Sequence, residues 1–203
     1  VGQEYGAYAQ SFPFDCPKTE RIRHQLYQYL VDHQGEDGSW GIPPQDTFAP
    51  LALLASGEKP YLEAVKKNVQ MHARTTSAED DSWLINWRYM AAAIVMSEYH
   101  LATGEKWVLK ELEEVYALLI SSQYIDMNQI NEKVKETHPH AYPKDEMDSH
   151  GGWGHNPGFE GYGPISMLTA QGALAFALMH RCGIDVDPAR HQAAYNFLQR
   201  SAG

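Results

Sequence analysis

The chain has 203 residues, of which 43% are hydrophobic and 11% aromatic, a composition that supports one sizeable folded domain and argues against disorder. Its 16 basic and 26 acidic residues give a formal net charge of −10, which repels nucleic acids and anionic membrane surfaces. We therefore expect neither a nucleic acid nor a membrane among its partners.

Two features bear on where the protein works. Cys16 and Cys182 are the only cysteines, and they could pair in an oxidising compartment or remain buried thiols in the cytosol. The chain begins with Val1 rather than Met, which is compatible with removal of a leader or an upstream domain. We favour an extracytoplasmic location over a cytoplasmic one.

Apolar residues at helical spacing predict a series of helices after an extended lead-in at residues 1–17. The first helix should run from about residue 18 to residue 33. The second should be capped by Asp46 or Thr47 and should end at Gly57. Further helices are expected at residues 60–73, 83–103 and 106–122, after Gly163-Pro164 and after Asp187-Pro188.

The expected helices alternate in character. The helix at 83–103, with Asp80, Asp81 or Ser82 as its cap, is apolar almost all round, which is typical of burial on most sides. The helices at 60–73 and 106–122 are amphipathic and should lie outside, with Asn68 among the outward residues of the former. A buried inner helix followed by an amphipathic outer helix is therefore the expected unit of an all-α fold.

The unit repeats along the chain. The helix-ending glycines Gly57 and Gly104 are 47 residues apart, whereas Gly104 and Gly183 are 79 apart because residues 124–149 form a polar insertion. Paired helices of this kind cannot bury their apolar faces alone, so they must stack as hairpins. A long insertion is usually functional or mobile.

The turns carry a resemblance. Gln34, Gly38 and Trp40 are spaced as in the repeat of triterpene cyclases, and Gln123, followed after the insertion by Gly152-Trp153-Gly154, resembles a second copy split open. Residues 18–203 thus resemble α/α toroids of the terpenoid cyclase and protein prenyltransferase type. They also resemble an uncharacterised bacterial toroid family of unknown function.

Rings of that type usually close with about six helix pairs. Three full pairs and one leading outer helix therefore imply about half of a toroid, an incomplete ring. The resemblance also implies further toroid repeats or an upstream domain in a longer protein.

The acidic run Glu79-Asp80-Asp81 is a first candidate for chemistry. Triterpene cyclases protonate their substrate with an Asp-x-Asp-Asp motif, and here Ala78 stands at the first position. We therefore interpret Asp80 and Asp81 as helix caps, which favour the positive end of the following helix.

The glycine-rich turn around Trp153 is the second candidate, because titratable side chains gather there ahead of an inner helix. Two histidines could act as acid and base, with a carboxylate partner and a tyrosine as proton donor or stacking surface. Toroidal polysaccharide lyases use similar arrangements, so this resemblance implies lyase- or hydrolase-like cleavage of a sugar polymer. The predicted catalytic residues are His150, His155, Glu160 and Tyr162.

A structural alternative exists for the same turn: its glycines permit the bend, Trp153 plugs between helix pairs and the histidines face solvent. Zinc binding by His150, His155 and a carboxylate is a weaker option because the spacing matches no strong metal motif. We therefore predict no metal site, and no cofactor can be named.

Aromatic and polar residues on the inner helix could line a cavity. The predicted substrate-binding residues are Trp83, Trp87, Arg88 and Trp153. Two functions remain open at this point: a carbohydrate-active enzyme, and a non-catalytic module whose concave face holds a peptide or a glycan.

Overall fold

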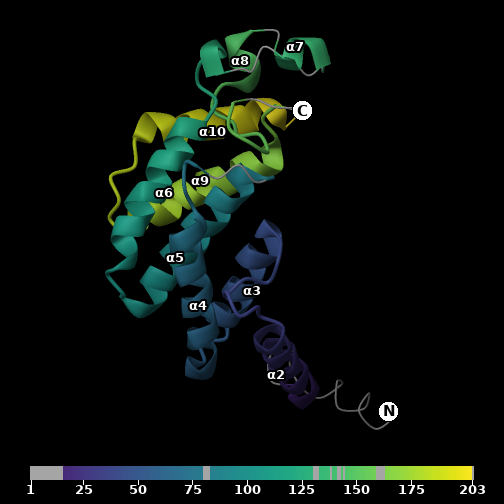
Figure 1. Ribbon diagram of the computed structural model, residues 1–203, viewed down its shortest axis with the longest axis vertical. Helices are drawn as coiled ribbons and strands as arrows, with labels where there is room; N and C mark the ends of the chain where they lie inside the picture. Colours follow the sequence, from purple (N-terminus) through teal and green to yellow (C-terminus); the bar gives the residue numbers. More distant parts are fainter. Residues whose placement is uncertain are drawn as a thin grey trace.

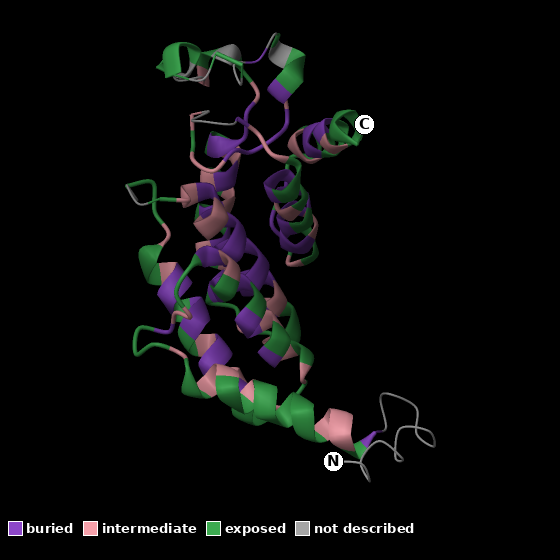
Figure 2. Cartoon of the chain, turned by 90° about the vertical axis from the view of Figure 1, so that its right-hand side faces the viewer, coloured by how far each residue is buried: buried purple, intermediate pink, exposed green. Residues whose placement is uncertain are grey.

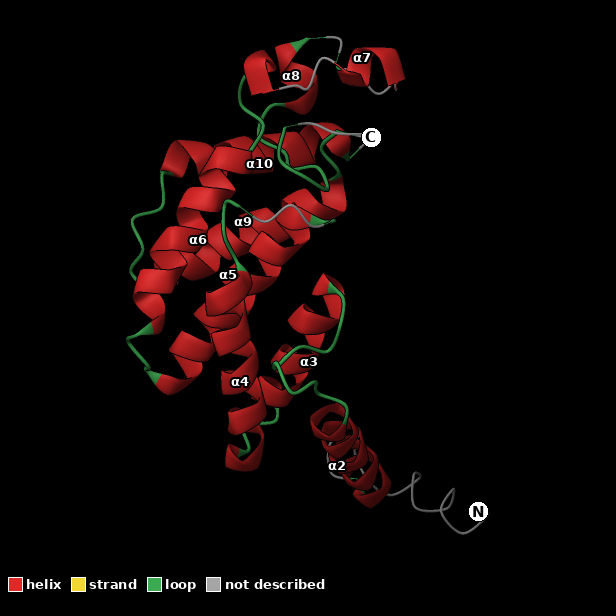
Figure 3. Ribbon diagram, in the orientation of Figure 1, coloured by secondary structure: helices red, strands yellow, loops and turns green. Residues whose placement is uncertain are grey.

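The computed structural model describes residues 16–79, 83–129, 133–137, 139–140, 143, 145–158 and 163–202. All regular structure within these residues is helical (Figure 3), which confirms the all-α class. No helix of the described part is long and apolar enough to cross a membrane. The longer helices are α2 (Pro17–Asp32), α3 (Pro43–Ala55), α4 (Lys59–Thr75), α5 (Ile85–Thr103), α6 (Val108–Ser122), α9 (Ser166–Arg181) and α10 (Pro188–Ser201).

These helices form hairpins that lie side by side (Figure 1). The hairpins are α3 with α4, α5 with α6, and α9 with α10, and their first members pack in a row with α5 between α3 and α9. Helix α2 packs against α3 and α4 at one end of the row. The hairpin repeat expected from the sequence is therefore present.

Helix α5 is the centre of the core. Every residue from Tyr89 to Ser97 is buried, because α3, α4, α6 and α9 surround the helix. Figure 2 shows this contrast in burial between the middle of the molecule and the exposed helix α2 at its edge. The all-round apolar pattern thus predicted the inner position of α5 correctly.

The start of α3 differs from the expectation. Neither Asp46 nor Thr47 is the cap, because α3 already begins at Pro43. Two prolines, Pro43 and Pro44, occupy the first turn, where backbone N–H groups have no partner within the helix and their absence costs little. Asp46 is the fourth residue of the helix and reaches back to the preceding turn.

Other expectations at the helix ends have mixed outcomes. Helix α5 begins at Ile85, after Leu84 in the left-handed region at φ 66°. The proposed caps Asp80, Asp81 and Ser82 lie outside the described residues, as does most of the 1–17 lead-in. Cys16 and Cys182 are thiols and form no disulfide.

The described residues of the insertion at 124–149 form short helical pieces. They are η2 (Met127–Gln129), α7 (Lys133–Thr137) and α8 (Glu146–Ser149). In Figure 1, α7 and α8 lie at the end of the molecule opposite to α2. The insertion therefore extends the chain away from the hairpin row and leaves the row itself uninterrupted.

The turn between α2 and α3 is held by one glutamine and one tryptophan. The Gln34 side-chain amide donates to Gly38 O at 2.9 Å and to Ala64 O of α4 at 2.8 Å. The Trp40 indole N–H donates to Leu30 O at 2.7 Å. One glutamine thus joins the end of an outer helix, the turn and the next outer helix.

The turn between α6 and α9 repeats each of these contacts. The Gln123 side-chain amide donates to Gly151 O at 2.9 Å and to Arg190 O of α10 at 3.0 Å. The Trp153 indole N–H donates to Leu119 O at 3.0 Å. The insertion separates Gln123 from Gly151 in sequence, but the two turns have the same hydrogen bonds.

The glycine of each turn lies against the backbone of an outer helix. A Cβ added to Gly38, at φ +100°, would lie 2.5 Å from Lys67 O, and one added to Gly151, at φ +94°, would collide with Ala193 O. Gly57, at φ +68°, has no atom within 4 Å of such a Cβ. Gly38 and Gly151 therefore face both a conformational and a packing constraint, whereas Gly57 faces only the first.

We expect Gly38→Ala to lower the free energy of unfolding by more than about 2 kcal/mol, because alanine adds strain and a backbone collision. The matched control Gly57→Ala should cost about 1 kcal/mol, the price of the left-handed conformation alone. Urea unfolding of both variants measures the difference. Equal losses in the two variants would contradict the close approach of α4 to the turn.

Candidate functional site

The turn before α9 is fastened to the beginning of α5. The backbone N–H of Asn86 donates to His155 O at 3.1 Å, and its side-chain amide donates to Gly154 O at 2.9 Å. The N–H of Ile85 donates to the side-chain oxygen of Asn156 at 3.1 Å. These contacts satisfy N–H groups in the first turn of α5, which have no partner within the helix.

The same junction brings Trp87 and His155 together. The Trp87 indole N–H donates to His155 Nδ1 at 2.9 Å, and the two rings lie nearly parallel with centroids 6.1 Å apart. An imidazole that accepts at Nδ1 carries its proton at Nε2 when it is neutral. The pair therefore holds His155 in one tautomer beside a half-buried indole.

The other sequence-predicted residues lie in different surroundings. Trp83 is 70% exposed, whereas Trp153 has no exposed surface and packs edge-on against Phe176. His150 is half-buried, and its backbone oxygen accepts from Arg200 Nη2 at 2.6 Å. Glu160 and Tyr162 lie outside the described residues.

Arg88, the neighbour of Trp87 in sequence, lines a polar pocket. Its volume is about 350 Å³, and it lies between the start of α3, the end of α4 and the first turns of α5. This volume is within the range of small-molecule sites. The polar side chains that line it are Asp37, Ser39, Asp46, His72, Arg74, Thr75, Thr76 and Arg88.

Asp46 is the buried carboxyl group of this pocket, with 6% of the residue exposed. Its Oδ1 accepts from Trp40 N at 2.6 Å and from the Asn68 amide at 3.3 Å, and its Oδ2 accepts from Ser39 Oγ at 2.7 Å. Burial raises the pKa of the Asp46 carboxyl, and these hydrogen bonds oppose that rise.

His72 is the buried imidazole, with 4% of the residue exposed. Its Nε2 donates to the backbone oxygen of Asp46 at 3.4 Å. Burial and, to a smaller extent, the positive charge of Arg88 lower the pKa of His72 to about 4, against the opposing effect of the hydrogen bond to Asp46. His72 is therefore neutral at pH 7.

The turn before α9 shows which residue takes the place of Asp46 in the second repeat. Asp46 is the fourth residue of α3, and Thr169 is the fourth residue of α9. Trp153 N donates to Thr169 Oγ1 at 3.2 Å, as Trp40 N donates to Asp46. A threonine therefore performs the bracing role of Asp46 in the second repeat.

The outer helices α4 and α10 share a register as well. Arg74 Nη2 donates to Asp37 O at 3.1 Å, and Arg200 Nη2 donates to His150 O, each just before the glycine of its turn. The backbone oxygens that accept from the turn glutamines belong to Ala64 and Arg190. Each of these residues precedes the arginine of its own helix, Arg74 or Arg200, by ten positions. The same register makes Ala194 the counterpart of Asn68 and Leu198 the counterpart of His72.

The two repeats thus build one local fold with different side chains. The first repeat has Asp46, Asn68 and His72 where the second has a threonine, an alanine and a leucine. Burying polar groups costs free energy unless hydrogen bonds compensate for it. Since the fold forms without this polar trio, we interpret Asp46 and His72 as functional residues of the pocket, with Asn68 as a hydrogen-bond donor that supports Asp46 from outside its lining.

Sequence reasoning placed only Arg88 of this pocket among the candidate residues. It assigned Asp46 to a helix cap and pointed Asn68 outward, whereas Asn68 is fully buried. A residue-by-residue comparison of the two turns would have found the Asp46 and Thr169 difference. Within the described residues, no group of three or more His, Cys, Asp and Glu side chains could hold a metal ion.

We expect acid to destabilise the protein through His72. Its folded-state pKa of about 4 lies below the ordinary value of 6.5, so the unfolded chain binds the extra proton between these two values. Stability is full above pH 6.5 and falls toward pH 4 by about 3 kcal/mol. Asp46 has the opposite sign, because its raised pKa makes its burial less costly as pH falls.

Thermal unfolding of the protein and of His72→Leu between pH 7 and pH 4 isolates this contribution. The leucine variant should lose about 3 kcal/mol less over that range. Parallel pH dependence in the two proteins would show that His72 does not remain neutral in the folded state.

Comparisons with known proteins add one finding. A family model described as Domain of unknown function (DUF6288) matches residues 19–203. No curated protein and no solved structure matches the chain.

Proposed function

We propose that this chain, which belongs to the family described as Domain of unknown function (DUF6288), is a glycan-binding module. Its ligand would lie across the face where α3 and α5 begin. The observation that carries the proposal is the polar pocket, in which the first repeat buries Asp46 and His72 and the second repeat has Thr169 and Leu198 in their place.

The chemistry of the pocket suits a neutral, hydroxyl-rich ligand. Two guanidinium groups, Arg74 and Arg88, are balanced by two carboxyl groups, Asp37 and Asp46, so the pocket offers both donors and acceptors without a net charge. Sugar hydroxyls can pair with both kinds of group. A strongly anionic ligand is disfavoured by the overall charge of −10.

Two tryptophans, Trp83 and Trp87, precede Arg88 of the pocket in the sequence. Trp87 and Arg88 are consecutive on α5, and the exposed indole of Trp83 precedes them. A large exposed aromatic ring indicates a binding surface, because its apolar face is left in water. Trp83 would stack on one sugar ring while the pocket takes the next.

The half-toroid architecture is a further proposal. The row formed by α3, α5 and α9 supports it, as does the paired arrangement with α4, α6 and α10. In such an array the starts of the inner helices share one mouth, which is where the pocket and Trp87 lie.

The proposal can be tested by placing second-repeat residues in the first repeat. The triple variant Asp46→Thr, Asn68→Ala and His72→Leu should keep its fold, because the second repeat has the same fold with these residues. Its affinity for neutral oligosaccharides should fall roughly tenfold or more, since the pocket loses its polar partners. Calorimetric titration with a panel of neutral, acidic and peptide ligands measures the change.

His180→Leu is the matched control, because it replaces an exposed histidine at the far end of α9. It should leave both the affinity and the melting temperature unchanged. A triple variant that folds and retains full affinity would overturn the proposal. A peptide that competes better than any sugar would replace the glycan with a peptide ligand.

Cleavage of a sugar polymer is a second candidate, favoured by the fixed tautomer of His155. With Nδ1 accepting from Trp87, the neutral imidazole carries its N–H at Nε2 and could donate a hydrogen bond to the negative charge that develops on a leaving-group oxygen. His150, Glu160 and Tyr162 remain the predicted partners in this reaction.

If the protein cleaves glycans, His155→Ala should abolish turnover and leave the melting temperature nearly unchanged, because the turn is also held by backbone contacts to Asn86. Trp87→Phe is the informative control: it frees Nδ1 and should shift the pH profile of turnover. Undiminished turnover in His155→Ala, or a large loss of stability, would contradict a catalytic role for His155.

A further inference from the structure

An apolar groove lies between α2 and α3 at the edge of the hairpin row. Its volume is about 510 Å³, and its lining includes Tyr29, Leu30, Trp40, Phe48, Ala49 and Ala52. Phe48 is 66% exposed and Tyr29 is 56% exposed. Large apolar side chains in this arrangement mark a surface that another apolar element covers.

The second repeat shows what covers the corresponding surface. Helix α5 packs against both α6 and α9, which correspond to α2 and α3. A Cβ added to Gly172 of α9 would lie 3.0 Å from Met90 of α5 and 2.7 Å from the Trp153 ring. Helix α5 therefore closes over this tryptophan, which has no exposed surface.

In the part of the chain that the structure describes, no helix covers the corresponding surface of the first repeat. Trp40 makes the indole hydrogen bond that Trp153 makes, yet it lines an open groove and is only partly buried. By the register of the helix starts, Ala49 stands where α9 has Gly172, and Ala52 stands where it has Ala175. Small residues thus line the floor of both grooves, which permits close approach of a helix.

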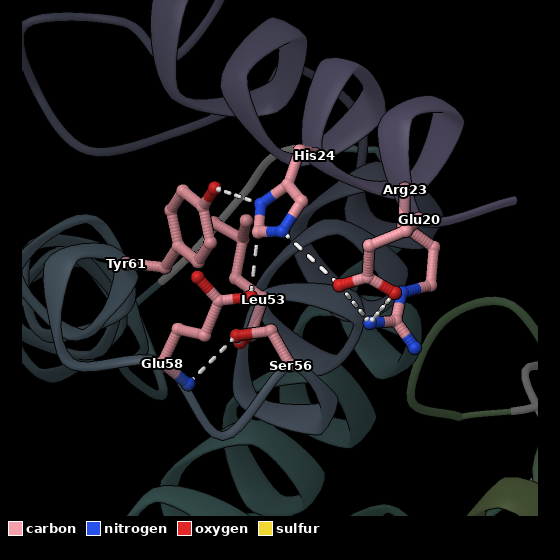
Figure 4. A network of polar contacts seen from close by, with 7 residues as sticks. All are labelled: Glu20, Arg23, His24, Leu53, Ser56, Glu58 and Tyr61. Carbon is pink, nitrogen blue, oxygen red and sulfur yellow. Dashed lines mark hydrogen bonds and ion pairs between the residues drawn. The ribbon is translucent and has the colours of Figure 1, made fainter. Parts of the chain in front are cut away.

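Helix α2 is attached to the row by polar contacts and by side chains that are only partly buried, among them Tyr27, Leu30 and Val31. None of its residues is buried, and Figure 4 shows His24 pointing at the Tyr61 hydroxyl of α4, 3.5 Å away, with Glu58 beside it. Its apolar residues Ile22 and Leu26 are exposed and stand one turn apart. An amphipathic helix with an open apolar stripe lacks a partner on that side.

The arrangement of the row also selects the kind of partner. Helix α2 corresponds to α6, the outer helix that packs against α5 and α9. The place that corresponds to α5 is therefore open to a single inner helix, because the outer helix that would accompany it is already present as α2. A second copy of the chain would bring α9 together with its outer helix α10, and α10 would compete with α2 for one place. A complete hairpin or a second copy therefore fits poorly.

We propose that the groove between α2 and α3 binds one α-helix of another polypeptide, in the position that α5 occupies between α6 and α9. The bound helix should be apolar on the faces that meet α2 and α3, and it should pack closely over Ala49 and Ala52. Its binding would bury Phe48 and Trp40. This inference is independent of the glycan pocket, which lies on the other side of the turn.

The probe is a labelled synthetic peptide with the sequence of α5, Ile85–Thr103, flanked by lysines for solubility. It should bind the protein with a stoichiometry of one, as measured by fluorescence anisotropy. Phe48→Asp should weaken binding roughly tenfold or more, because a buried aromatic contact is replaced by a charge. Leu174→Asp, a change at a half-exposed leucine of α9 at the other end of the row, should leave binding unchanged.

Three controls complete the experiment. Both variants must melt at the temperature of the parent protein, which is expected because both side chains are largely exposed, and a scrambled peptide should not bind. Absence of binding, or equal loss in both variants, would overturn the proposal. Gel filtration that shows a dimer lost in Phe48→Asp would overturn it in favour of a second copy of the chain.

Discussion

The side-chain amide of one glutamine in each of the two glycine-tryptophan turns is the interaction on which these two junctions of the hairpin row depend. Gln34 and Gln123 each bond the carbonyl of a turn glycine and a carbonyl of the next outer helix. Gln123 is fully buried, where loss of such a bond leaves the partner group unsatisfied. The glycine is required because the backbone of that outer helix lies directly against it.

This constraint explains how the chain tolerates its long insertion. The contacts of Gln123 fix where the chain leaves α6 and where it re-enters at Gly151, so the geometry of the turn does not depend on the length of the path between them. A longer loop between fixed ends costs little additional entropy. The insertion can therefore carry α7 and α8 away from the row without disturbing the packing of α6, α9 and α10.

The same constraint separates structural residues from functional ones. Thr169 shows that the turn needs only an acceptor for the tryptophan N–H, which a hydroxyl supplies at no cost in buried charge. Asp46 supplies that acceptor at a price, since burial raises its pKa. A residue that is less favourable for stability than an available alternative is expected mainly at functional sites.

Features that depend on a pattern within one helix or one turn could be predicted from the sequence, whereas features that depend on contacts between helices could not. The position of α5 was predictable because its apolar pattern covers all sides of the helix, and the turn copies were predictable from Gln34, Gly38 and Trp40. The cap assigned to Asp46 was wrong because the rule for caps is local, whereas Pro43 had already started the helix. The pocket was not predictable, because Ser39, His72 and Arg88 meet only through the packing of three helices.

The two ends of the row differ in how much apolar surface their outer helices bury. At the α9 end, the outer helix α10 buries Ala194 and Phe197 against its own hairpin partner. At the α2 end, no inner helix lies beside the outer helix within the described residues, and no residue of α2 is fully buried. The hydrophobic contribution to stability scales with apolar area removed from water, so α2 is the least stabilised of the long helices. A helix that fills the groove would add that missing area, and it would do so beside the turn whose Asp46 and Ser39 form one wall of the polar pocket.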